Sequence, residues 1–166
     1  MVDGDSASAA ELFALLSGIA GVPLKQSLAV TGAISQQGEI LPIGGVNQKI
    51  EGFFDLCRAQ GLTGDQGVII PIANVPDLML KNEVIEAVGA GLFSVYAVAA
   101  ADEALEILTD LPAGQRGDDG VFSEGSFNRL VEDRLKIMAE KAKAHPEEED
   151  KDNKKSETSR CSRGAC

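Results

Sequence analysis

Short apolar runs rich in β-branched residues alternate with segments of helical period along the first two thirds of the chain. The runs cover residues 27–34, 39–43, 67–70 and 93–98, and the helical segments cover residues 8–20, 47–60, 75–90 and 102–109. This alternation predicts an α/β (α+β) fold, in which helices flank a small sheet. Because the polar sequence Ser35-Gln36-Gln37-Gly38 joins the first two runs, we expect a hairpin there, which makes the sheet mixed.

The expected helices have polar residues at their ends. Ser6 or Ser8 is expected to cap the first helix, because a side-chain oxygen there can accept a bond from an unpaired helical N–H group. Asn47 and Asp102 are expected to cap the second and fourth helices in the same way. Asn82 is expected to interrupt the third helix, which would then form two pieces.

Composition divides the chain into four parts. A length of 166 residues is enough for one domain with a hydrophobic core, which we place at residues 1–111. Residues 112–126 are rich in Gly, Asp and Ser and are expected to form a linker. Residues 127–144 carry apolar residues among charges and predict a terminal helix. Residues 145–166 are charged and polar, which predicts a disordered tail.

Charge and hydropathy exclude some classes of partner. The net charge of −11 argues against direct nucleic-acid binding, because an acidic surface repels phosphate groups. The sequence contains no apolar run near the roughly 20 residues that a membrane-spanning helix needs, so no membrane partner is expected. The three cysteines form neither a disulfide framework nor a zinc-binding pattern, so we expect a cytoplasmic protein without a metal.

Ser6 and Lys49 are the strongest candidates for chemistry. A serine hydroxyl becomes a good nucleophile when a neighbouring base removes its proton. His145 is the single histidine and adjoins the polar tail, which argues against a Ser-His-Asp triad. A lysine can replace histidine if burial lowers its pKa by several units. Ile50 and Phe53 follow Lys49 closely, so we expect its amine to be buried among apolar groups.

Each of these residues also has an ordinary structural explanation. A serine before a helix most often caps it, and a lysine at a helix start is most often a solvated charge. Asp3 could do no more than favour the helix dipole. Thr31 could be an ordinary strand residue, although its hydroxyl could also orient the Lys49 amine. The residues taken singly therefore leave a serine–lysine dyad as one option among several.

Three motifs, in order along the chain, resemble the proteolytic domain of Lon, the ATP-dependent serine protease, and its LonB-like branch in particular. Asp3-Gly4-Asp5-Ser6-Ala7-Ser8 resembles the family's nucleophile motif Asp-Gly-Pro-Ser-Ala-Gly. Thr31-Gly32 resembles its Thr-Gly pair. Gly38-Glu39-Ile40-Leu41-Pro42-Ile43-Gly44-Gly45-Val46, followed by Lys49, resembles its lysine motif. The resemblance extends to about Leu108 and covers roughly two thirds of the chain.

The resemblance assigns roles to these residues. It implies that Ser6 is the nucleophile, Lys49 the base, Thr31 the orienting hydroxyl and Asp3 a weaker polar contact. It implies no cofactor in this chain, but ATP with Mg in an ATPase module upstream, so the chain is expected to be an N-terminally truncated C-terminal part. It also implies unfolded or damaged proteins as substrates and a ring of six subunits. Asp5, Ser8 and Ala33 depart from the family's usual residues.

Two other functions remain open at this point. The chain could be a non-catalytic Lon-like domain that serves assembly, or an inactive fragment, and we expect the isolated chain to cleave peptides weakly or not at all. A general esterase is disfavoured, because the sequence has neither a nucleophile elbow nor a histidine placed for catalysis.

Overall fold

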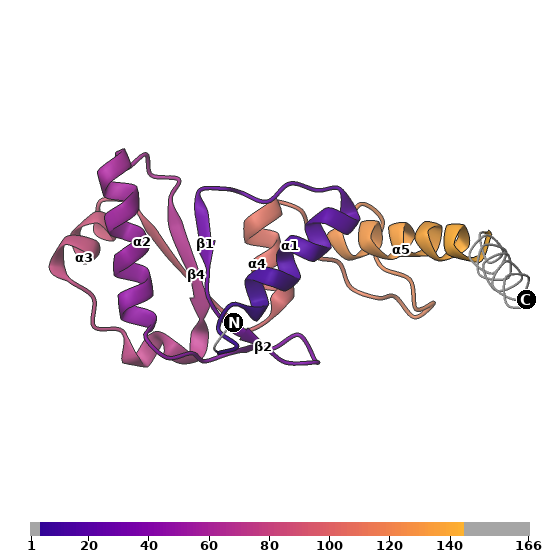
Figure 1. Ribbon diagram of the computed structural model, residues 1–166, viewed down its shortest axis with the longest axis horizontal. Coiled ribbons are helices and arrows are strands. Elements are labelled where there is room, and N and C mark those ends of the chain that lie inside the picture. The colour runs from indigo at the N-terminus through magenta and orange to yellow at the C-terminus, as the bar shows by residue number, and fades with distance from the viewer. Residues whose placement is uncertain (1–3, 145–166) are drawn as a thin grey trace, which may run out of the picture.

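A three-stranded parallel sheet lies between two groups of helices (Figure 1). The computed structural model describes residues 4–144. The strands lie in the order β1 (Leu28–Val30), β4 (Gly67–Pro71), β5 (Ser94–Val98). Because β4 pairs with both of the other strands, β1 forms one edge of this sheet.

The first predicted strand is divided into two at Thr31 and Gly32. After β1, strand β2 (Ala33–Ile34) pairs antiparallel with β3 (Ile40–Leu41) in a separate two-stranded sheet. The predicted hairpin is therefore present, but the expectation of one continuous strand over residues 27–34 is wrong. The Thr31 N–H still donates to β4, whereas the Gly32 N–H donates to the carbonyl oxygen of Ser6, which turns the chain out of the sheet. The predicted α/β class is confirmed, with its parallel and antiparallel strands in two sheets.

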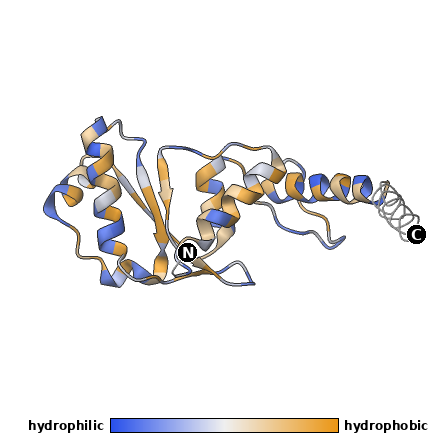
Figure 2. Cartoon of the chain, in the orientation of Figure 1, coloured by the Kyte–Doolittle hydropathy of each residue, from blue (hydrophilic) through white to orange (hydrophobic). Residues whose placement is uncertain are grey.

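Two hydrophobic cores pack against opposite faces of the parallel sheet. On one face lie α1 (Ser8–Ala20), α4 (Ala101–Thr109) and the start of α5 (Phe127–Ala144). On the other lie α2 (Val46–Gln60) and α3 (Asn82–Gly89). Side chains alternate along a strand, so Ile69 of β4 enters the first core while Val68 and Ile70 enter the second. The strands are accordingly strongly hydrophobic in Figure 2.

The predicted caps are wrong, although α1 has the predicted bounds. The N-cap of α1 is Ala7, and no side chain caps it. The Ser8 hydroxyl accepts instead from the Ile34 N–H at 3.1 Å. Asn47 lies inside the first turn of α2, whose N-cap is Gly45 at a φ of 68°. Long-range bonds have therefore taken the polar atoms that were expected to cap the helices.

The third and fourth helices begin differently from the prediction. A 3-10 helix, η1 (Ile72–Asp77), follows β4, and α3 starts at Asn82 instead of being interrupted there. The fourth helix, α4, has Ala100 as its N-cap, and Asp102 accepts a bond from Asn128 rather than capping it.

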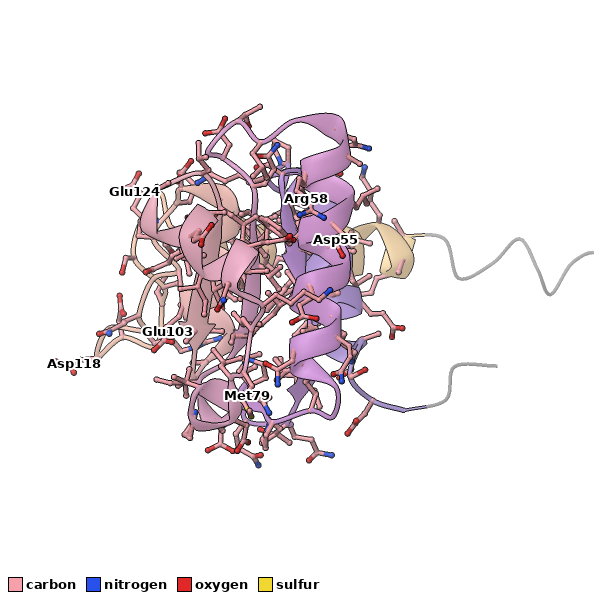
Figure 3. All side chains as sticks on the ribbon, turned by 90° about the vertical axis from the view of Figure 1, so that its left-hand side faces the viewer. Asp55, Arg58, Met79, Glu103, Asp118 and Glu124 are labelled. Carbon is pink, nitrogen blue, oxygen red and sulfur yellow. The ribbon has the colours of Figure 1, made fainter. Side chains whose placement is uncertain are left out.

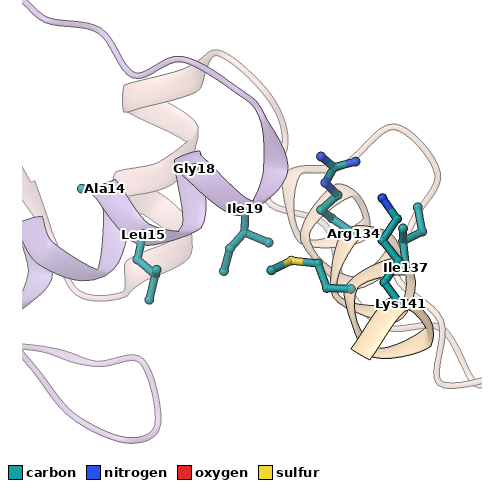
Figure 4. Close-up of a pocket in the computed structure, with 8 residues that line it drawn as sticks. Ala14, Leu15, Gly18, Ile19, Arg134, Ile137 and Lys141 are labelled. Atoms are coloured by element: carbon teal, nitrogen blue, oxygen red, sulfur yellow. The ribbon is translucent and has the colours of Figure 1, made fainter. Parts of the chain in front are cut away.

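A loop and a long helix complete the described chain. Residues 112–126 form a loop, within which Arg116 and Phe122 make an isolated bridge. Helix α5 then extends away from the sheet, and an apolar groove of about 380 Å³ lies between it and α1 (Figure 4). The predicted disordered tail, residues 145–166, lies outside the described residues. Within residues 4–144, no helix has both the length and the apolar character needed to cross a bilayer.

Candidate active site

Ser6 lies in a tight turn immediately before α1. The turn is closed by the Ser8 N–H, which donates to the Asp5 carbonyl oxygen at 3.0 Å. Two further bonds attach it to the end of β1: the Gly32 N–H donates to the Ser6 carbonyl oxygen at 2.9 Å, and the Ala9 N–H donates to the Gly32 carbonyl oxygen at 3.2 Å. The backbone from the Ser6 carbonyl to Ala9 is thus fixed to Gly32, which follows β1.

Lys49 comes from the first turn of α2 and meets Ser6 directly. Its Nζ donates to Ser6 Oγ at 2.8 Å and to Thr31 Oγ1 at 3.3 Å. Thr31 Oγ1 in turn donates to the Ser6 carbonyl oxygen at 3.3 Å. Three side chains singled out from separate parts of the sequence therefore form one hydrogen-bonded group. Asp3, the fourth candidate, lies outside the described residues.

The expected burial of Lys49 is wrong for the part of the chain that the structure describes. Lys49 is exposed, Ser6 is half-buried, and Thr31 is 8% exposed. The apolar residues that follow Lys49 do not surround its amine, since Ile50 and Phe54 face the core beneath α2. Lys49 lies at the margin of that helical face, so its amine reaches across the helix start toward Ser6.

A hollow of about 280 Å³ adjoins the dyad. Besides Ser6, Thr31 and Lys49, small apolar side chains from the N-cap of α1, from α1 itself, and from β1 and β4 line it: Ala7, Ala10, Ala29, Val30 and Val68. The hollow therefore offers an apolar surface beside a serine hydroxyl and a lysine amine. Such a combination is typical of a site that holds one side chain of a substrate.

The turn also presents backbone donors. Among the hydrogen bonds of residues 4–144, neither the Ser6 N–H nor the Ala7 N–H donates to a protein acceptor. Both precede α1, where unpaired N–H groups are common. They can therefore bond to a negatively charged oxygen placed next to Ser6.

Asn74 is a buried residue whose role the sequence did not reveal. It is 5% exposed, and its Oδ1 accepts from the Ile43 N–H at 2.9 Å while its Nδ2 donates to the Ile43 carbonyl oxygen at 3.1 Å. These bonds fix the chain just before Gly44 and Gly45, which lead into α2. The sequence offered one indication of this role, an amide side chain soon after a buried strand. The residue that Asn74 bonds to, Ile43, lies 31 residues away and could not be identified from local sequence.

The described part of the chain holds no group of three or more His, Cys, Asp or Glu side chains able to bind a metal ion. Cys57, on α2, is buried, and this burial raises the pKa of its thiol. The chemical groups gathered around Ser6 are thus a hydroxyl, an amine, a second hydroxyl and backbone N–H donors.

Comparison with known proteins identifies a family for this chain. Residues 2–110 match the family model described as the Lon protease (S16) C-terminal proteolytic domain. A protein of Escherichia coli (strain K12), named as a Lon protease homolog, is 54% identical over 110 residues, which are 66% of this chain and 19% of that protein. Another so named, from Haemophilus influenzae, is 42% identical over 139 residues, 84% of this chain and 23% of that protein.

The "Archaeal Lon protease" of Halobacterium salinarum is 42% identical over 141 residues, which are 85% of this chain and 16% of that protein. The chain thus spans less than a quarter of the length of these relatives. The matches confirm the resemblance drawn from the three sequence motifs.

Proposed function

The chain belongs to the Lon protease (S16) C-terminal proteolytic domain family, and from that membership we propose that it is the peptide-cleaving part of a serine-type endopeptidase. The observation that carries the proposal is the 2.8 Å contact between Lys49 Nζ and Ser6 Oγ. That distance is within reach for proton transfer from the hydroxyl to a neutral amine.

In the proposed reaction, Ser6 Oγ attacks the carbonyl carbon of the peptide while its proton passes to the neutral Lys49 amine. Breakage of the C–N bond leaves an ester on Ser6, and the Lys49 ammonium returns the proton to the departing amine. A water molecule then attacks the ester, Lys49 again takes a proton, and the Ser6 hydroxyl is restored. Thr31 keeps the amine on the correct side of Ser6.

The N–H groups of Ser6 and Ala7 are proposed as donors to the oxyanion that forms during both attacks. A preorganised donor of this kind contributes roughly 3–4 kcal/mol to the stability of the transition state. The neighbouring hollow is proposed to take an apolar side chain of the substrate, because alanine and valine side chains line much of it.

The proposal for a longer protein rests on the family alone. We propose that such a protein uses ATP with Mg, assembles as a ring of six in the cytoplasm and degrades unfolded or damaged proteins. The chain contains no Gly-x-x-x-x-Gly-Lys-Ser/Thr sequence, so it offers no phosphate-binding loop for ATP. No step of the peptide cleavage proposed above depends on the nucleotide.

One observation favours the alternative of a non-catalytic assembly domain. A lysine acts as a base in its neutral form, and burial is a common means of favouring that form, yet Lys49 is exposed within residues 4–144. A functional test of Ser6 and Lys49 distinguishes the two proposals.

Hydrolysis of a fluorogenic peptide with an apolar residue before the cleaved bond provides that test. We expect slow turnover by the wild-type chain and none above background for Ser6→Ala or Lys49→Gln. Lys49→Arg should be equally inactive, because a guanidinium stays charged and cannot accept the proton. Turnover that persists in the Ser6→Ala variant would refute the assignment.

A further inference from the structure

Two asparagines join the start of α2 to the segment that follows β4. Asn74, from η1, makes the two bonds to Ile43 described above. Asn47, from α2, makes two bonds in the opposite direction: its Nδ2 donates to the Asp77 carbonyl oxygen at 3.1 Å, and its Oδ1 accepts from the Met79 N–H at 2.9 Å. We refer to Asn47, Asn74 and these four bonds as the asparagine clasp.

The clasp surrounds the most adaptable point of the connection to α2. Gly44 and Gly45 lie between Ile43 and Asn47, and Gly45 adopts the left-handed conformation with a φ of 68°. Strand β3, which precedes them, has two residues, and no side chain caps α2. Local structure therefore leaves the position of the helix start weakly determined, and the clasp fixes the chain on both sides of the glycine pair.

Asn74 and the backbone that Asn47 binds belong to the segment that directly follows the buried central strand. η1 follows β4, the central strand, whose five residues are all buried. Figure 3 shows Met79 beside the end of α2 at which the helix begins. The four bonds thus hold the first turn of α2 at a fixed position relative to the central strand.

Lys49 lies two residues after Asn47 in that first turn. We propose that Asn47 and Asn74 are positioning residues that hold Lys49 Nζ within hydrogen-bond distance of Ser6. Neither asparagine side chain is hydrogen-bonded to Ser6 or Lys49. Both therefore act through the backbone of residues 43–49. This inference rests on the proposed function, because it assigns the clasp a part in the same dyad.

If the clasp positions Lys49, its removal should make Ser6 less reactive in chains that remain folded. A displacement of about 1 Å costs a catalytic group roughly 100-fold in rate. We therefore expect Asn74→Ala and Asn47→Ala to react with a fluorophosphonate at Ser6 at least about tenfold more slowly than the wild type. Asn74→Asp keeps the acceptor for the Ile43 N–H and loses the donor, so its rate should lie between those of the wild type and Asn74→Ala.

The matched control is Asn128→Ala, which removes the bond from Asn128 Nδ2 to Asp102. It should react at the wild-type rate. All rates are to be measured at a temperature at which circular dichroism shows each variant to be folded. Wild-type rates in folded Asn47→Ala and Asn74→Ala chains, with Lys49→Gln far slower than the wild type, would overturn the proposal.

Amide hydrogen exchange separates this proposal from the proposed function. In Asn74→Ala, the N–H groups of Ile43 and Lys49 should exchange faster than in the wild type, while that of Ile70 in β4 should not change. If exchange responds in this way but the wild type never reacts at Ser6, the protease proposal fails and the clasp remains. Unchanged exchange at Ile43 and Lys49 would overturn the clasp as a positioning device.

Discussion

At the scale of single residues, the site depends on one buried hydroxyl. Thr31 is 8% exposed and links the other two side chains, since its Oγ1 accepts from Lys49 Nζ and donates to the Ser6 carbonyl oxygen. An ordinary strand residue would need no such contacts. The hydroxyl therefore orders the amine and the nucleophile turn at the same time.

Thr31→Val should remove this link with little change of volume. The Lys49 amine becomes charged as it takes the Ser6 proton, and loss of a hydrogen bond to a charged group costs about 1.5–3 kcal/mol, which corresponds to roughly a 10- to 150-fold slower reaction of Ser6. The control is Thr109→Val, which removes the bond from Thr109 Oγ1 to the Leu105 carbonyl oxygen in α4. Equal fluorophosphonate rates for the two valine variants would show that Thr31 has no part in the dyad.

At the scale of elements, close packing between β4 and β5 requires a glycine. A Cβ atom added at Gly67 would lie 2.6 Å from the Ser94 carbonyl oxygen, whereas one added at Gly52 in α2 would meet no atom within 4 Å. Gly67→Ala should therefore lower the free energy of unfolding by about 1–3 kcal/mol. Gly52→Ala should raise it by up to about 1 kcal/mol, because alanine favours a helix interior.

Urea denaturation of both glycine variants measures these changes. The same substitution, glycine to alanine, is expected to lower the free energy of unfolding at one position and to raise it at the other. A general effect of alanine cannot produce both changes. Destabilisation by Gly52→Ala, or an unchanged free energy of unfolding for Gly67→Ala, would contradict the packing described.

The elements that the sequence predicted well are those determined by local pattern. α1 has apolar residues at helical spacing and begins and ends as predicted, and α2 ends at Gln60, also as predicted. The caps failed because Ser8 and Asn47 bond to partners 26 or more residues away, which no local pattern reveals. The expectation of one continuous strand over residues 27–34 failed for a similar reason, because the Gly32 N–H donates to the Ser6 carbonyl oxygen and not to the sheet.

In the candidate site too, local motifs were predictable and long-range contacts were not. Ser6, Lys49 and Thr31 were named from motifs, and the fold brings them together. The exposure of Lys49 could not be anticipated, because its apolar neighbours in sequence face the core beneath α2. The part played by Asn74 depends on a backbone segment that is distant in sequence.

At the scale of the whole molecule, the proposed dyad joins the two halves of the fold. Ser6 precedes α1, which packs in one core, and Lys49 belongs to α2, which packs in the other. Thr31 follows the edge strand β1 between them. The proposed nucleophile and its proposed base therefore come together when both cores are packed against the same sheet, and on this proposal reactivity at Ser6 reports on the complete fold.

The rate at which a fluorophosphonate modifies Ser6, followed by mass spectrometry of the peptide that contains it, tests the central claim most directly. If Lys49 activates Ser6, the wild-type chain should acquire the adduct at Ser6 about 100-fold faster than Lys49→Gln, and Ser6→Ala should acquire none at this position. A wild-type chain without an adduct at Ser6, or equal rates for the wild type and Lys49→Gln, would contradict the serine–lysine dyad.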